Sequence, residues 1–218
     1  GDLTLTEKDE FIYHEMITHV PMAVHPLVKD VLVIGGGDGG VVRELVKYEE
    51  IEHIDMVEID PLLVEVCRKY LPQIACSLND PRVQIFHEDG LRFVRSKTDC
   101  YLIIIDSPNP FGLGEGLFTK EFYGNCFGAL REDGIMINQN ESPFYTEEAF
   151  QCQRMHKRIL ETFPICRVYQ AHLPSYPSGH WLFGFASKKY HPLTDLNGVA
   201  WKLKGIHTRY YEPRLHAG

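Results

Sequence analysis

The chain alternates short apolar runs with segments whose apolar residues recur at helical spacing. Residues 30–37, "DVLVIGGG", read as a buried strand ended by glycines, and residues 41–48, "VVRELVKY", read as a helix. The alternation continues with strands expected at 53–60, 82–90, 101–106 and 134–140, and helices at 61–71, 90–97, 119–131 and 146–162. Repeated strand-helix units predict a mostly parallel sheet with helices on both faces.

The pattern changes toward the C-terminus. Two apolar runs at 165–173 and 181–189 are separated by a turn, "PSYPSGH", with no helix between them, which predicts an antiparallel hairpin. A further helix is expected at 8–21, before the first strand. The fold class is therefore α/β, a Rossmann-like doubly wound sheet that is mostly parallel and ends in an antiparallel hairpin. Its 218 residues, 44% of them hydrophobic, suit one domain spanning 1–218.

Charge and composition argue against several classes of partner. The formal net charge of −8 and the absence of a Lys/Arg-rich block give little support to a nucleic-acid surface. The six cysteines are scattered, without a C-x-x-C pair, and we expect reduced thiols in a cytoplasmic protein with no membrane span. His14 and His19 in "HEMITH" are five residues apart rather than four, which argues against a zinc-protease motif.

A glycine-rich loop follows the first predicted strand. Gly35, Gly37 and Gly40 fit G-x-G-x-x-G, and Glu58 lies eighteen residues beyond the last of them. Glycines let the backbone approach a ligand, and an acid after the second strand can accept hydrogen bonds from ribose hydroxyls. The pattern fits NAD or an adenosylmethionine-type molecule equally. A tight turn followed by a solvated acid is the alternative reading.

Two further acids refine this reading. Asp38 lies inside the glycine loop, where its carboxylate would repel a pyrophosphate and attract an ammonium or sulfonium group. Asp89, in "EDG" at 88–90, lies where a nucleoside base could be held. Aspartate at a strand-helix junction also suits a helix N-cap, and both readings of Asp89 can hold together.

Asp106 ends the apolar run "IIID" and so is expected at the mouth of a buried sheet. Desolvation of a carboxylate there is costly unless a cation or hydrogen bonds compensate for it. A loop acid capped by the amides of Ser107 and Asn109 is the alternative. Acids at the ends of consecutive strands favour a shared ligand site at that edge of the sheet.

Taken together, these stretches resemble the spermidine synthase family of polyamine aminopropyltransferases. The matching segments include "EKDEFIYHEM", "VLVIGGGDGG", "MVEID", "NDPRV", "IIIDSPNP", "PSYPSG" and "RYYEPRLH", and they span nearly the whole chain. The resemblance implies a fold like that of class I methyltransferases. It also implies that the amine of putrescine attacks the propyl carbon of decarboxylated S-adenosylmethionine, a co-substrate, giving spermidine and methylthioadenosine without a separate cofactor or metal.

The resemblance also implies roles by position. Glu58 would bind the ribose, Asp89 and Gly90 the adenine, and Asp38 the aminopropyl ammonium, with Asp106 as the catalytic base. The full donor-binding set is Gly35, Gly37, Asp38, Glu58, Asp89, Gly90 and Leu113. The amine-binding set is Tyr13, His14, Asp38, Asp106, Asn109, Gln139 and Tyr176. A homodimer or homotetramer is expected.

The chemistry of amine transfer agrees with these roles. An alkyl amine with a pKa near 10.4 is unprotonated in only about one molecule in a few thousand at pH 7, so it must be deprotonated in place. A carboxylate such as Asp106 can orient the nitrogen and accept its proton, while Tyr13 and Tyr176 help to exclude water.

The chain departs from the family pattern in the loop after Asp106. The family loop usually reads D-S/C-T-D/E-P-x-G-P, and here Pro108, Asn109 and Leu113 replace a threonine, an acid and a proline. Asn109 removes a charge that would hold the diamine. We also expect the family's small N-terminal β segment to be absent and its C-terminal tail to be truncated. Two alternatives therefore stay open: an S-adenosylmethionine-dependent methyltransferase, and a catalytically impaired homologue that binds a nucleoside or polyamine.

Overall fold

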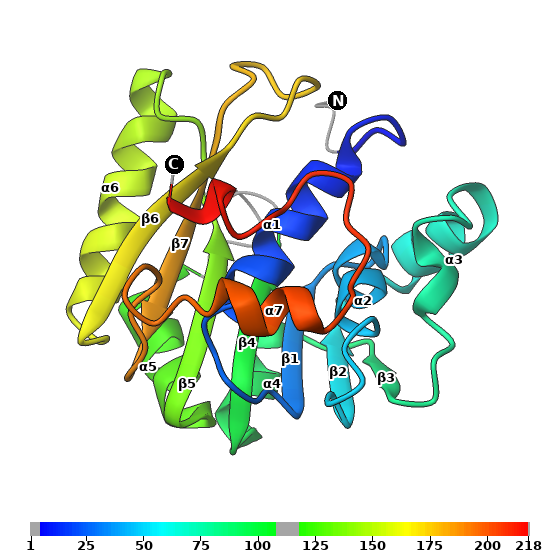
Figure 1. The fold of residues 1–218 in the computed structure, drawn as a ribbon, viewed down its shortest axis with the longest axis horizontal. Helices are drawn as coiled ribbons and strands as arrows, with labels where there is room; N and C mark the ends of the chain where they lie inside the picture. The colour runs from blue at the N-terminus through cyan, green and yellow to red at the C-terminus, as the bar shows by residue number, and fades with distance from the viewer. Residues whose placement is uncertain (1–4, 108–117, 218) are drawn as a thin grey trace.

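The computed structural model describes residues 5–107 and 118–217, which form a seven-stranded sheet between two layers of helices (Figure 1). The strand order is β3-β2-β1-β4-β5-β7-β6. The strands are β1 (Asp30–Gly35), β2 (His53–Val57), β3 (Val83–Phe86), β4 (Cys100–Asp106), β5 (Leu130–Gln139), β6 (Ile165–Ala171) and β7 (Trp181–Ser187). Strands β1 to β5 pair in parallel, whereas β7 pairs antiparallel with both β5 and β6. The predicted doubly wound sheet with an antiparallel C-terminal hairpin is confirmed.

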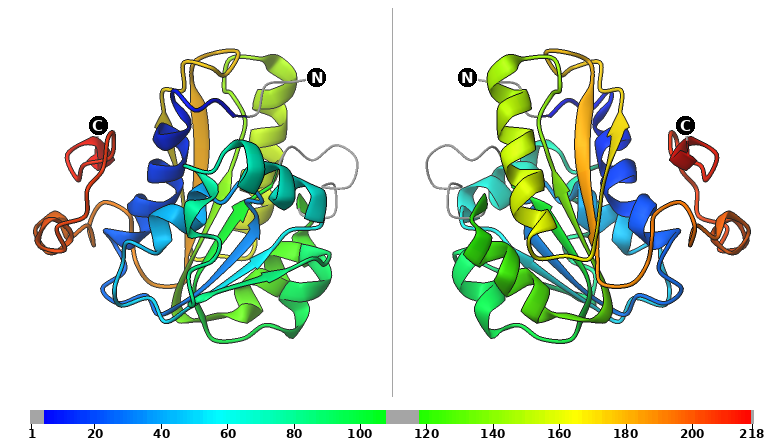
Figure 2. Two further views of the ribbon diagram at one scale, coloured as in Figure 1. Left: turned by 90° about the vertical axis from the view of Figure 1, so that its right-hand side faces the viewer. Right: turned by 90° about the vertical axis from the view of Figure 1, so that its left-hand side faces the viewer.

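The helices divide between the two faces of the sheet (Figure 2). On one face lie α1 (Glu10–Met22), α2 (Gly40–Leu45) and α3 (Pro61–Tyr70), and α7 (Gly198–Leu203) lies on the outer side of α1. The other face is covered by α4 (Gly90–Ser96), α5 (Lys120–Ala129) and α6 (Thr146–Leu160). Short 3-10 turns follow at Ala75–Ser77 and Leu215–Ala217.

The central strands are apolar on both sides because both sides are buried. In β1, Val31 and Val33 pack toward α1 and α2, while Leu32 and Ile34 pack into the opposite core with α5. Such strands read as continuous apolar runs rather than alternating ones. This is why the short glycine-ended run at 30–37 was a sound strand prediction.

Several element boundaries differ from the sequence prediction. β5 begins at Leu130, four residues before the predicted start at 134, because Leu130 pairs with Cys100 across a register irregularity. β2 ends at Val57, so Glu58 follows the strand rather than lying within it. Extra pairing of this kind depends on the neighbouring strand, and the local sequence carries no signal for it.

Helix α1 is almost entirely buried, and one of its acids fastens the C-terminal segment to it. Glu15 is 1% exposed and accepts hydrogen bonds from the backbone N–H groups of Arg209, Tyr210 and Tyr211, each at 2.8 Å. A buried carboxylate with three such donors is satisfied without a basic side chain. The C-terminal segment is thereby fixed to α1.

No helix within residues 5–107 and 118–217 is long and apolar enough to cross a membrane. The six cysteines are free, as the scattered spacing predicts.

We expect Glu15→Gln to lower the free energy of unfolding by about 2–4 kcal/mol, because the amide offers one acceptor oxygen where the carboxylate offers two. Urea unfolding measures the loss, and hydrogen exchange should show faster exchange at Tyr210 and Tyr211. Glu65→Gln on the exposed face of α3 is the matched control and should leave both unchanged. Equal stability of the two variants would contradict the role of Glu15.

Candidate active site

The candidate site lies where the carboxyl ends of β1 and β4 meet. Gly35 and Asp106, the last residues of these strands, are register partners. β1 is flanked by β2 on one side and β4 on the other, so this edge is the point where the order of strands reverses. Ligands of open α/β sheets bind at such a point.

The glycine loop is shaped by its contact with the end of β4. Gly35 and Gly36 have φ angles of 85° and 72°, which favour glycine. The N–H of Gly36 donates to the backbone oxygen of Asp106 at 2.9 Å, and a Cβ on Gly35 would lie 2.0 Å from that same oxygen. The first glycine of the motif is therefore required by the close approach of two strands' ends.

The two carboxylate oxygens of Asp106 differ in whether they have a hydrogen-bond partner. Oδ1 accepts a hydrogen bond of 2.6 Å from the hydroxyl of Tyr13. Oδ2 is buried and has no hydrogen-bond partner within the described part of the chain. Burial, and next the charge of Asp38, raise the pKa of Asp106 to about 6. The group is thus mostly ionised at neutral pH and more basic than an ordinary aspartate.

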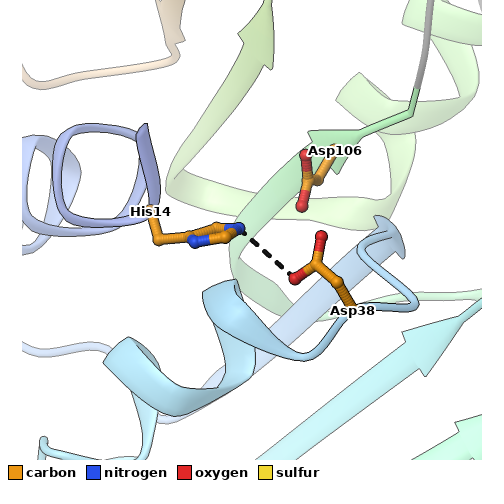
Figure 3. A group of neighbouring side chains, drawn as sticks. All are labelled: His14, Asp38 and Asp106. Atoms are coloured by element: carbon orange, nitrogen blue, oxygen red, sulfur yellow. Dashed lines mark ion pairs between the residues drawn. The ribbon is translucent and has the colours of Figure 1, made fainter. Parts of the chain in front are cut away.

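His14 lies between two carboxylates. Its Nδ1 is 2.6 Å from Oε2 of Glu10, and its Nε2 is 3.3 Å from Oδ1 of Asp38 (Figure 3). Burial acts to lower the pKa of His14, but the two carboxylates outweigh it and raise that pKa to about 10. Burial conversely acts to raise the pKa of Asp38, but His14 and the Gly40 N–H, which donates at 2.7 Å, hold it below the usual value. The pair is an imidazolium and a carboxylate.

The sequence analysis missed two members of this cluster. Arg43 donates through both terminal nitrogens to the two oxygens of Glu10, each at 2.9 Å. Burial acts to raise the pKa of Glu10, but hydrogen bonds from His14 and Arg43 lower it. Glu10 stands four residues before His14 on a helix, a spacing that could have identified it. Arg43 lies on α2 and no local motif marks it.

An aromatic wall stands beside Tyr13. The ring centroids of Tyr13 and Tyr176 are 6.4 Å apart, and those of Tyr176 and Trp181 are 4.6 Å apart. The indole N–H of Trp181 donates to Oε1 of Gln139 at 3.1 Å. The wall begins at Tyr13, whose hydroxyl binds Asp106, and continues through Tyr176 to Trp181.

Gln139 links three parts of the site. Its Nε2 donates to the backbone oxygen of Ser107 at 2.8 Å, and its Oε1 accepts from Trp181. The amide therefore braces the residue after Asp106 against β7. Its expected contact with an amine stays a prediction.

Glu58 lies beside the glycine loop, and Asp89 lies between β3 and α4. Glu58 is 7% exposed and accepts from the N–H groups of Gly37 at 3.2 Å and Asp60 at 3.0 Å. Burial raises its pKa in spite of these bonds. Asp89 caps α4 by accepting from the N–H of Leu91 at 2.9 Å, so its N-cap reading is confirmed.

The structure gives a position for some of the remaining predicted residues and tests none of their roles. Gly90 is buried and starts α4 directly after Asp89. Asn109 and Leu113 lie outside the described residues. The ribose, adenine and amine contacts assigned from the resemblance stay predictions.

The cluster can hold a cation. His14, Asp38 and Asp106 each offer an atom within 4.8 Å of the others. Three carboxylates, those of Glu10, Asp38 and Asp106, face two basic groups, His14 and Arg43, so acids exceed cations by one in this group. Such an excess in a buried space favours a positively charged ligand, either an ammonium group or a metal ion.

The comparisons with known proteins agree on one family. Residues 10–197 match the family model described as "Spermine/spermidine synthase domain". The polyamine aminopropyltransferases of Alkaliphilus oremlandii and Clostridium perfringens are each 66% identical over 219 residues, a match that covers 100% of this chain and 77% of each relative.

Solved structures give the same result. A spermidine synthase in complex with the transition state analogue AdoDATO has a TM-score of 0.96 at 43% identity, covering 99% of this chain and 74% of that one. Spermidine synthase from Thermotoga maritima has a TM-score of 0.92 at 42% identity, covering 99% of this chain and 72% of that one. The chain therefore belongs to the spermine/spermidine synthase family, as a transferase of the polyamine aminopropyltransferase type.

Proposed function

We propose that this chain transfers the aminopropyl group of decarboxylated S-adenosylmethionine to putrescine, giving spermidine and methylthioadenosine. The observation that carries the proposal is the Asp106 carboxylate, held by Tyr13 at 2.6 Å through Oδ1 and unpaired at Oδ2 among the described residues, next to Asp38 and His14. The similarity to a spermidine synthase that is described with a transition state analogue supports the same reaction.

Asp106 would act as the base in this reaction. The putrescine nitrogen attacks the propyl carbon next to sulfur, the new C–N bond forms, and the C–S bond breaks with its electron pair going to sulfur. The nitrogen must lose a proton, and Oδ2 of Asp106, which has no hydrogen-bond partner in the described part of the chain, would accept it. The rings of Tyr13, Tyr176 and Trp181 favour the neutral amine because an apolar wall disfavours its charged form.

The donor would occupy the glycine-loop side of the site. Glu58 would accept hydrogen bonds from the ribose, Asp89 and Gly90 would border the adenine, and Gly35 and Gly37 would permit close approach of the backbone. Asp38 would pair with the aminopropyl ammonium. Intact S-adenosylmethionine carries a carboxylate next to that ammonium, and it would meet the negative charges of Asp38 and Asp106. This repulsion favours the decarboxylated donor and disfavours the methyltransferase alternative.

The reaction needs no cofactor or metal in this proposal, because the sulfonium is already a good electrophile. We also propose a cytoplasmic enzyme, which the six free cysteines support. Assembly into a dimer or tetramer stays a prediction.

The first test is a mass-resolved transfer assay. With decarboxylated S-adenosylmethionine and putrescine we expect spermidine and methylthioadenosine in equal amounts. With intact S-adenosylmethionine we expect no spermidine, no methylthioadenosine and no methylated putrescine. Asp106→Asn should lower kcat by about 10²–10⁴-fold, the contribution typical of a positioned general base.

The matched control for this substitution is Asp99→Asn. Asp99 is exposed on the surface with a φ of 62°, a conformation that asparagine tolerates. The activity of Asp99→Asn should therefore equal that of the parent chain. Full activity of Asp106→Asn would remove the base from the proposal, and methyl transfer to an acceptor would favour the methyltransferase alternative.

The second test is the pH dependence of kcat/KM for putrescine at a saturating donor concentration. Asp106 must be ionised to accept a proton, and its pKa of about 6 predicts activity that falls about tenfold per pH unit below pH 6 and levels off above it. Putrescine stays protonated across pH 5–8, so its own titration does not create this limb. Activity that is flat down to pH 5 would contradict the assignment.

The third test addresses a metal. Because His14, Asp38 and Asp106 could also ligate an ion, the transfer assay should be repeated after dialysis against EDTA and with added Mg²⁺, Mn²⁺ or Zn²⁺. We expect unchanged kcat in EDTA. Loss of activity that one of these ions restores would show that the cluster holds a metal instead of an ammonium.

A further inference from the structure

We propose that binding of the donor's ammonium group at Asp38 displaces the Nε2 proton of His14. When the aminopropyl ammonium reaches Asp38, this proton leaves to solvent, and the neutral imidazole then accepts a hydrogen bond from the ammonium. The inference rests on the proposed function because it takes an ammonium-bearing donor as the ligand. It goes beyond that function in assigning a proton exchange to binding, before any chemistry occurs.

The geometry favours two protons on His14 before a ligand binds. The ring is 1% exposed, and each nitrogen faces a carboxylate, Nδ1 toward Glu10 at 2.6 Å and Nε2 toward Asp38 at 3.3 Å. A neutral imidazole has one N–H and would turn a lone pair toward one of these acids. The imidazolium has an N–H for each carboxylate.

The surroundings of His14 are acidic on every side that reaches it. Within residues 5–107 and 118–217, the charged and titratable groups that face the ring are Glu10 and Tyr13 from α1, Asp38 from the glycine loop and Asp106 from β4. Arg43 pairs with Glu10, the partner of Nδ1. The high pKa of His14, about 10, agrees with this setting and means that the imidazole is protonated at neutral pH.

An arriving ammonium competes for the same carboxylate. Asp38 already accepts from the Gly40 N–H, and a second cation beside the imidazolium would place two like charges together in a buried space. Release of the Nε2 proton removes this repulsion and frees a lone pair for one ammonium N–H. The ammonium brings one positive charge to Asp38 and His14 gives one up, so this exchange leaves the charge of the His14–Asp38 pair unchanged, while the donor's sulfonium still adds a positive charge to the acidic site.

Glu10 and Arg43 decide which proton is lost. Glu10 holds the Nδ1 proton, and the paired hydrogen bonds from Arg43 keep Glu10 ionised, so the proton cannot simply pass to Glu10. Nε2 is therefore the nitrogen that exchanges. Glu10 acts through His14 and is a positioning residue rather than a catalytic one.

The exchange distinguishes the donor from its nucleoside product. Decarboxylated S-adenosylmethionine brings an ammonium to Asp38, whereas methylthioadenosine has lost the aminopropyl group. After transfer, His14 can regain its proton as the new polyamine leaves. The empty and product-bound sites then share the same charge, and only ligands with an ammonium need to displace a proton.

Calorimetric titration in buffers of different ionisation enthalpy counts the protons released. At pH 7.5 the parent chain should release about one proton per site on binding decarboxylated S-adenosylmethionine and close to none on binding methylthioadenosine. By linkage, the Kd of the donor should fall about tenfold per pH unit between pH 7 and pH 9, while that of methylthioadenosine stays constant. Equal proton release by the two ligands, or none by the donor, overturns the exchange.

Glu10→Gln supplies the matched variant, because its amide oxygen can still accept the Nδ1 proton while the negative charge is gone. We expect proton release on donor binding at pH 8.5 to be smaller in Glu10→Gln, because one of the carboxylates that raise the pKa of His14 is gone while Asp38 remains, and to stay near one in Glu65→Gln. Full release in Glu10→Gln overturns the role of Glu10. If that variant does not fold, the comparison of the two ligands on the parent chain decides.

The outcomes separate this inference from the proposed function. Donor binding without proton release overturns the exchange and leaves aminopropyl transfer standing. Absence of donor binding overturns both. Proton release on donor binding, combined with no spermidine in the transfer assay, supports the exchange and overturns the proposed reaction.

Discussion

The organisation of the site depends on a carboxylate placed where it is costly to bury. Asp106 ends a strand whose preceding residues are fully enclosed, and its burial raises its pKa to about 6. Tyr13 satisfies one oxygen, and the neighbouring Asp38 adds negative charge instead of relieving it. The surrounding structure therefore has to compensate the negative charge of the acids that the sheet brings together, and it compensates only part of that charge.

Helix α1 supplies most of that balance. Tyr13 and His14 are adjacent on one side of the helix and reach Asp106 and Asp38, while Glu15 on another side fastens the C-terminal segment. A Cβ on Gly40 would lie 2.2 Å from the His14 ring, so the last glycine of the loop makes room for that histidine. Gly40 thus leaves space for the His14 side chain in addition to its part in the shape of the loop.

Much of this arrangement could be predicted because strand periodicity and strand ends are local properties. Apolar runs ended by polar residues located β1, β2 and β4, and parallel pairing brings the ends of β1 and β4 together, so the proximity of Asp38 and Asp106 follows from topology. The early start of β5 and the bonds of Gln139 depend on neighbouring strands. Arg43 was missed because its partner, Glu10, comes from an element thirty-three residues away.

The acidic excess links folding to ligand binding. In the empty protein, the raised pKa of Asp106 means that its ionised form is less favourable in the folded chain than in the unfolded chain, a cost present above pH 6 and relieved as the pH falls. His14 and Arg43 offset part of the repulsion among the acids, and a bound cation offsets more. A site that is incompletely neutralised when empty thus gains most from a ligand that carries positive charge. Its affinity for cationic substrates and its local instability have the same physical origin.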